Sequence, residues 1–215
     1  MEDINERLKR AAIVGAVKEL KKCLKDPGCD ARSRDKCGLT ALMWAACYGQ
    51  DSCTELLLPV SDALCVCEGG ITALMWAARG GNTSCIQILL PVSDALMKDN
   101  GGMSALMKAA YMGHKGCAGL LLPVSYVLAQ DDKGISALMH AALSRNEDCV
   151  RLLLPVSNAL AKDKDGRTAS KAARMNKHES LAQFIDAYIL SQSDQATISE
   201  ALCPVNPRGR AALRV

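Results

Sequence analysis

The chain has 215 residues, of which 49% are hydrophobic and only 3% aromatic, and its net charge is +3 at pH 7. The apolar content excludes a disordered polymer, and so small a net charge gives no reason to predict a nucleic-acid or membrane-lipid partner. Because the amino terminus is charged and no run of about 18 apolar residues occurs, we expect a cytoplasmic protein without a secretory signal or a membrane span.

The first segment, residues 1–34, predicts a helical cap. It contains the pattern AA-x-x-G at Ala11, Ala12 and Gly15, followed by Cys23 and Leu24, which is a degraded form of a unit that recurs later in the chain. Charged residues surround this pattern, as expected of a terminal unit whose outer face meets water. We therefore expect the segment to close the amino end of a helical stack.

A 32-residue unit follows and recurs at 35–66, 67–98, 99–130 and 131–162. Each copy begins Asp-x-x-Gly-x-Thr or Ser, except that Cys67 replaces the Asp of the second copy. The Thr or Ser can cap a short helix with paired alanines, which a glycine such as Gly49 ends in a left-handed conformation. A second helix carries a leucine run and stops at a proline. The unit is helix, turn, helix and an extended, hairpin-like tip.

The same repetition explains many of the eleven cysteines. Four stand at one position of the unit, just before the leucine run: Cys53, Cys85, Cys117 and Cys149. Stacked helices lie roughly 8–10 Å apart, beyond the Cα separation of about 7 Å that a disulfide tolerates. We predict reduced thiols on the buried face of the second helix.

Residues 163–190 predict the carboxy-terminal cap. Its second helix is longer, with Leu181, Phe184, Ile185, Tyr188 and Ile189 at helical spacing. Residues 191–215 lose the register of the unit. We expect them to form a largely flexible tail, with a short helical turn near 197–202 and a basic end.

The motif D-x-x-G-x-T-A-L-M-x-A-A-x-x-G, followed by L-L-L, resembles the ankyrin repeat over about residues 1–190. Its TALM and LLLPVSDAL style is most similar to the ankyrin-only proteins of diplomonad protozoa. The chain departs from the usual repeat by having Ala after the Thr, Met for the usual His, and a connection one residue shorter. The resemblance implies an all-α ankyrin-repeat solenoid, capped at both ends, that acts as a non-enzymatic interaction or scaffold module. We expect a monomer whose partner is another protein.

In ankyrin stacks the tips and the first helices line a concave groove, so variable residues at those positions are candidate partner contacts. They are Lys36, Leu39, Trp44, Tyr48, Glu68, Ile71, Trp76, Arg79, Met103, Lys108, Tyr111, Met112, Lys133 and His140. Aromatic residues, which are enriched in binding hot spots, gather in the first part of this groove. Two interpretations of Trp44 and Trp76 stay open: the indoles fill the core, or they anchor a partner.

Other functions have weaker sequence support. The three histidines lack ligand spacing and no catalytic or phosphate-binding motif is found, so we expect no catalytic residue, metal or cofactor. The alternative is a thiol-based zinc or redox protein that uses Cys37, Cys65 and Cys67, although alternating residues of an extended tip point to opposite sides. A third hypothesis is a targeting or regulatory subunit for a kinase-type effector. Acidic residues interrupt the basic ones along the tips, which argues against nucleic-acid binding.

Overall fold

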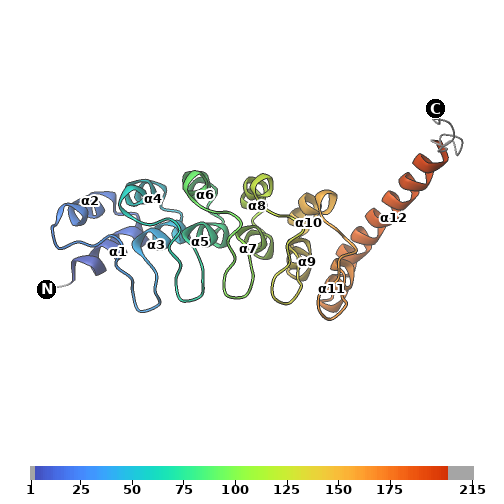
Figure 1. The fold of residues 1–215 in the computed structure, drawn as a ribbon, viewed down its shortest axis with the longest axis horizontal. Coiled ribbons are helices and arrows are strands. Elements are labelled where there is room, and N and C mark those ends of the chain that lie inside the picture. Colours follow the sequence, from blue (N-terminus) through green and yellow to red (C-terminus); the bar gives the residue numbers. More distant parts are fainter. Residues whose placement is uncertain (1–2, 203–215) are drawn as a thin grey trace, which may run out of the picture.

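The computed structural model describes residues 3–202, and only the backbone of residues 194–202. Helices pair along one row (Figure 1). The inner helices are α1 (Ile4–Val14), α3 (Ala41–Tyr48), α5 (Ala73–Gly80), α7 (Ala105–Met112), α9 (Ala137–Leu143) and α11 (Ala169–Met175). The outer helices are α2 (Val17–Lys25), α4 (Asp51–Leu57), α6 (Thr83–Leu89), α8 (Lys115–Leu121) and α10 (Glu147–Leu153), and α12 (Glu179–Leu202) ends the row. The described chain forms no strand, only one isolated bridge between Gln130 and Ser136. The predicted all-α solenoid is confirmed.

Each inner helix of the repeated units begins at the predicted Thr or Ser. Thr40 Oγ1 accepts a hydrogen bond from the backbone N–H of Met43 at 3.4 Å, and the same bond recurs in the four later units. Gly49 then ends α3 with φ of 70°, as predicted. At the same position of the last two units, Arg145 and Lys177 adopt φ of 58° and 63°, which is unfavourable for residues that carry a Cβ.

Side chains of one unit close the helix ends of the unit before it. Asn82 Nδ2 donates to the carbonyls of Ala46 and Cys47 at 2.7 and 2.8 Å. Gly49 leaves room for this contact, because a Cβ there would lie 2.6 Å from Asn82 Oδ1 and would push the amide aside. Such bonds satisfy carbonyls that a helix leaves free at its carboxyl end, and they fix adjacent units to each other.

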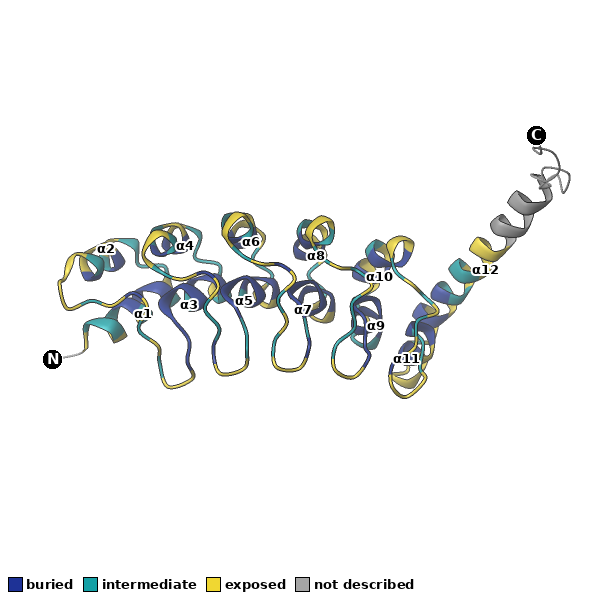
Figure 2. Ribbon diagram, viewed as in Figure 1, coloured by how far each residue is buried: buried dark blue, intermediate teal, exposed yellow. Residues whose placement is uncertain are grey.

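The core lies between the two helix layers (Figure 2) and is built from small and aliphatic residues. Paired alanines such as Ala45 and Ala46 are fully buried, which allows inner helices to approach closely. The four equivalent cysteines are buried as predicted, and all ten described cysteines are unpaired. Burial raises the pKa of the Cys117 and Cys149 thiols to about 11, so both are protonated at neutral pH.

The last helix closes the stack and then leaves it (Figure 1). Leu181 and Ile185 are buried and Phe184 is half-buried, in agreement with the predicted helical spacing. Residues 197–202 are helical as predicted, but they form the end of α12, which runs without a break to Leu202, and not a short turn of their own. No Gly or Pro occurs between residues 179 and 202 to end it earlier. The remainder of the predicted basic tail, residues 203–215, lies outside the described residues.

A short 3-10 turn follows each outer helix of the central units, and from it the chain crosses to the next tip. These turns are η1 (Leu58–Val60), η2 (Leu90–Val92), η3 (Leu122–Val124) and η4 (Leu154–Val156). Each of these 3-10 turns holds the proline that was predicted to stop the second helix. In the part of the chain that the structure describes, no helix has the length and apolar character needed to cross a membrane.

Candidate functional site

The tips and the inner helices lie on the same side of the outer helices (Figure 1), and their exposed side chains are here called the inner surface, on which the groove is predicted. Each tip is shaped by its first residue: Asp99 Oδ1 accepts the backbone N–H groups of Gly101 and Met103, both at 2.9 Å. The tips that begin with Asp35, Asp131 and Asp163 have the same pair of bonds. Backbone bonds also join neighbouring tips, for example Asp132 N to Gly101 O at 3.1 Å. These hydrogen bonds therefore fix the conformation of each tip and its position next to the neighbouring tip.

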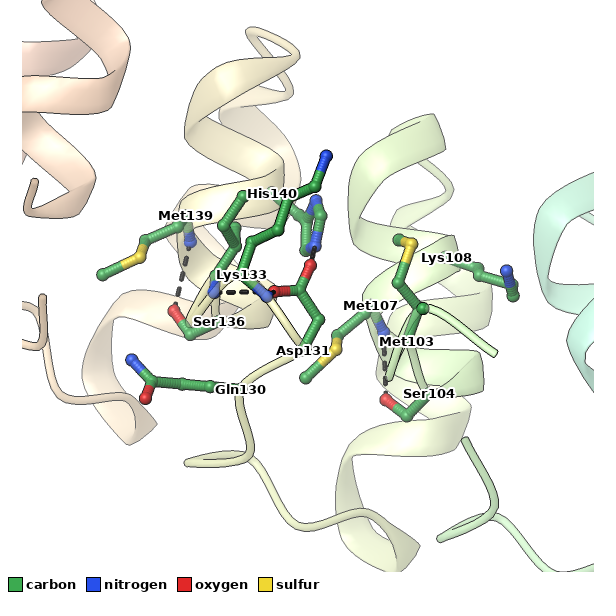
Figure 3. Close-up of polar contacts among 12 residues, drawn as sticks. Met103, Ser104, Met107, Lys108, Gln130, Asp131, Lys133, Ser136, Met139 and His140 are labelled. Atoms are coloured by element: carbon green, nitrogen blue, oxygen red, sulfur yellow. Dashed lines mark hydrogen bonds and ion pairs between the residues drawn. The ribbon is translucent and has the colours of Figure 1, made fainter. Parts of the chain in front are cut away.

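The second oxygen of the tip aspartate binds a side chain of the inner helix, and this side chain differs between units. The pairs are Asp35 with Trp44 Nε1 at 2.9 Å, Asp99 with Lys108 Nζ at 2.5 Å, and Asp131 with His140 Nε2 at 2.9 Å. Figure 3 shows the last of these pairs. In the last unit Ala172 stands at the helix position, and Arg167 Nε contacts Asp163 Oδ2 at 2.7 Å instead. In three units, therefore, three different side chains at this helix position bind the tip aspartate.

Three of the predicted partner contacts are mostly buried. Leu39, Lys108 and His140 are only 6–7% exposed. Leu39 packs in the core beneath its tip, while the ammonium of Lys108 and the imidazole of His140 are bound by tip aspartates. These three side chains hold the tips on the helices and present little surface to solvent, although Lys108 also lines a hollow beside α7.

The two tryptophans are half-buried and support exposed neighbours. The rings of Trp44 and Tyr48 stack with centroids 5.9 Å apart, and the Arg79 guanidinium lies 5.2 Å from the centre of the Trp76 ring. Each ring therefore packs partly in the stack and supports an exposed side chain, while the anchoring of a partner by these indoles stays a prediction.

A hollow of about 200 Å³ lies on the inner surface where the second and third repeated units meet. Arg79, Met103, Lys108, Tyr111 and Met112 line it, and all five were predicted to be partner contacts. Typical small-molecule sites measure roughly 300–1,000 Å³, so this hollow suits one side chain of a protein. Among the other candidates, Lys36, Tyr48, Glu68 and Lys133 are exposed and Ile71 is half-buried.

The three thiols of the alternative hypothesis do not form a shared site. Cys67 is buried, Cys37 is exposed, and the Cys65 sulfur lies 2.7 Å from Arg34 Nη2. Within residues 3–202, no group of three His, Cys, Asp or Glu side chains is arranged to hold a metal ion. The zinc or redox hypothesis therefore gains no geometric support.

Replacing Cys67 with Asp should raise the free energy of unfolding by about 1–3 kcal/mol. In the described chain Trp76 Nε1 is buried without a hydrogen-bond partner, whereas the equivalent Trp44 donates to Asp35. A carboxylate at position 67 would accept the indole N–H and the tip backbone N–H groups. Urea denaturation of the two proteins measures the change, and Cys67→Ser is the control that lacks the carboxylate. Equal stability of the Asp and Ser variants would contradict the role assigned to the tip aspartate.

The stability of the stack should fall below about pH 6.5 because of His140. Burial lowers the pKa of His140, although the hydrogen bond and charge of Asp131 act in the opposite direction. The folded state therefore takes up this proton at lower pH than the unfolded state, and stability is lost from the unfolded pKa down through the folded pKa, by at most about 1.4 kcal/mol per pH unit.

The matched variant for this pH dependence is His140→Trp, which copies the pair of Asp35 and Trp44. Unfolding free energies at about pH 7.5 and about pH 5.5 should differ less in the variant than in the unmodified chain. An equal difference in both proteins would assign the acid sensitivity to other groups.

The family model described as "Ankyrin repeats (3 copies)" matches the chain at residues 8–91, 61–128 and 120–192. These matches span the stack from α1 into α12, including every unit with the repeated motif. A comparison with curated proteins found no significant match.

Proposed function

The chain belongs to the ankyrin-repeat family, whose repeats serve as protein-interaction modules, and on this premise we propose that it binds a partner protein through its inner surface without catalysing a reaction. The observation that supports this proposal is the set of exposed side chains held there. Tyr48, Tyr111 and Met112 are 40–54% exposed although each belongs to a helix of the stack. Tyr is enriched in binding hot spots, and Met adapts its shape to a partner.

The hollow beside α7 favours an apolar side chain of the partner with an acidic residue next to it. Tyr111, Met103 and Met112 supply its apolar walls. The Lys108 charge is neutralised by Asp99, whereas no ion pair joins Arg79 to a carboxylate of the described residues. Arg79 is therefore the cation at this hollow that a partner's carboxylate can reach.

The stack offers this surface in a preformed state. Tyr48 rests on Trp44, and Tyr111 meets the edge of the His140 ring at a centroid distance of 5.8 Å. Because these supporting residues are fixed by tip aspartates, the exposed rings lose little conformational entropy when a partner binds.

The test is affinity capture from a lysate of the source cell with the unmodified chain and a Tyr48→Ala, Tyr111→Ala, Met112→Ala variant. The control is Glu55→Ala with Gln87→Ala, which alters exposed residues of the outer helices. Circular dichroism first establishes that both variants fold. We expect the inner-surface variant to lose the specific partner, with a Kd raised at least about 30-fold, and the control to retain it. Retention by both variants would exclude the inner surface as the site.

We further propose a cytoplasmic location, because the ten cysteines within residues 3–202 are all unpaired, which suits a reducing compartment. The TALM and LLLPVSDAL style favours kinship with the diplomonad ankyrin-only proteins. The identity of the captured protein decides whether the module also targets a kinase-type effector.

A further inference from the structure

The connections from the outer helices to the tips carry exposed apolar side chains that recur in every central unit. We call them the apolar stripe: Val60, Leu64, Val92, Leu96, Val124, Leu128, Val156 and Leu160. Each is between 43% and 63% exposed, and Figure 2 shows exposed stretches in these connections. None of these residues belongs to the predicted groove or lines the hollow beside α7.

The last three of the four connections share hollows with their neighbours. Leu96 of one connection and Tyr126 and Leu128 of the next line a hollow of about 450 Å³. Leu128 lines another, of about 280 Å³, together with Asn158 of the following connection. Leu96 and Leu128 thus lie on a surface that continues across three neighbouring connections.

The stripe has defined ends. In the amino-terminal cap, Gly28 and Arg32 stand where the other units have Val and Leu. At the other end, the equivalent positions 188 and 192 belong to α12, and both line a hollow of about 430 Å³ with Leu160, so the stripe ends against this helix. Eight half-exposed aliphatic side chains amount to several hundred Å² of apolar surface, which approaches one side of a specific interface and is large for a monomer.

We propose that the apolar stripe joins two copies of this chain into an antiparallel dimer with two-fold symmetry. A second copy presents the same side chains at the same 32-residue period, so all four connections can meet at once. Any other partner would need an equivalent spacing of its own. The dimer would replace the monomer expected from the sequence and would leave the inner surface free.

The antiparallel direction of the two copies follows from the exposed residue midway between the Val and the Leu of each connection. In chain order this residue is Asp62, Asp94, Tyr126 and Asn158. Antiparallel pairing places Asp62 opposite Asn158 and Asp94 opposite Tyr126 of the second copy, so each carboxylate meets a hydrogen-bond donor. Parallel pairing would place each aspartate opposite itself, which costs free energy by like-charge repulsion.

The carboxylates of Asp62 and Asp94 are held in place for contacts with the second copy. One oxygen of Asp62 and one of Asp94 accept the backbone N–H two residues later, at 2.9 and 2.8 Å. These bonds fix both side chains, and the second oxygen of each stays available to the Tyr126 hydroxyl or the Asn158 amide of the second copy.

The first test is sedimentation equilibrium of the full chain over a range of concentrations. We expect a monomer–dimer equilibrium whose Kd rises at least about 30-fold in a Leu96→Lys, Leu128→Lys variant. The control Tyr111→Ala, Met112→Ala alters the inner surface and should leave the Kd unchanged. A chain that stays monomeric at every concentration, or a dimer insensitive to the stripe variant, would overturn the proposal. Binding of a different protein to the stripe of a monomeric chain would overturn it too.

The second test compares Tyr126→Lys with Tyr126→Asp, two substitutions at one exposed position. In the antiparallel dimer the introduced ammonium would face Asp94 of the second copy and attract it, whereas the introduced carboxylate would repel it. The Lys variant should therefore associate about 10-fold more tightly than the Asp variant, or better, at low salt. The difference should shrink as salt screens the charges. Parallel pairing would place like charges opposite in both variants, so equal weakening by Lys and Asp would refute the antiparallel arrangement.

Discussion

Replacing Asp99 with Ala should lower the free energy of unfolding by about 3–5 kcal/mol. The change leaves the ammonium of Lys108, which is 7% exposed, buried without the carboxylate that binds it at 2.5 Å. It also removes the acceptor for the tip N–H groups of Gly101 and Met103. Urea denaturation followed by circular dichroism measures the loss.

Two further variants separate the buried charge from the tip bonds. Asp132→Ala removes an exposed aspartate of the next tip and should change stability by no more than about 0.5 kcal/mol. Asp99→Ala combined with Lys108→Met removes the unpaired charge, so it should be more stable than Asp99→Ala alone. A double variant as unstable as the single one would show that the tip bonds, and not the ion pair, dominate.

The same pair predicts sensitivity to acid. Burial raises the pKa of Asp99, but the Lys108 ammonium and the backbone N–H groups outweigh it and hold the pKa below the usual value. A carboxyl with a depressed folded pKa stabilises the protein above its unfolded pKa of about 3.9, and this contribution is lost as the pH falls through the folded pKa. The Asp99→Ala variant should therefore lose less stability between about pH 5 and about pH 3 than the unmodified chain.

The repeat architecture could be predicted because its determinants are local and recur at one spacing. Thr40 caps its helix within three residues, and Gly49 ends it, so both roles follow from short motifs. The buried cysteines and leucines follow from the helical period of the second helix. Repetition then confirms each assignment several times within one chain.

The pairing of Asp99 with Lys108 could not be predicted from local patterns. The partners are nine residues apart, and only the fold of the tip onto the helix brings them together. In the sequence alone, Lys108 and His140 are variable polar residues on a helix, and residues that bind a partner have the same pattern. The tip Asp and the variable helix residue are both visible in the sequence, but their pairing can be recognised only when the tip geometry is known.

The residues of the apolar stripe and of the long last helix have recognisable sequence patterns, but these patterns alone predict a plain connection and a flexible tail. The recurrent P-V-x-x-x-L was assigned to a connection, because its spacing does not tell which face a loop residue presents. Residues 191–202 lost the repeat register, yet their composition still allows a helix, and α12 continues through them.

Leu121→Ala should cost about 2–5 kcal/mol, whereas Lys36→Ala should cost no more than about 0.5 kcal/mol. Leu121 is fully buried in α8, which packs between α6 and α10, so the truncation leaves a cavity next to two neighbouring units. Lys36 is an exposed tip residue. Because a solenoid is stabilised by contacts between adjacent units, the loss at a central helix weakens both interfaces of its unit. Urea unfolding midpoints measure both variants, and a greater loss for Lys36→Ala than for Leu121→Ala would contradict the arrangement of core and tip on which the proposed binding surface depends.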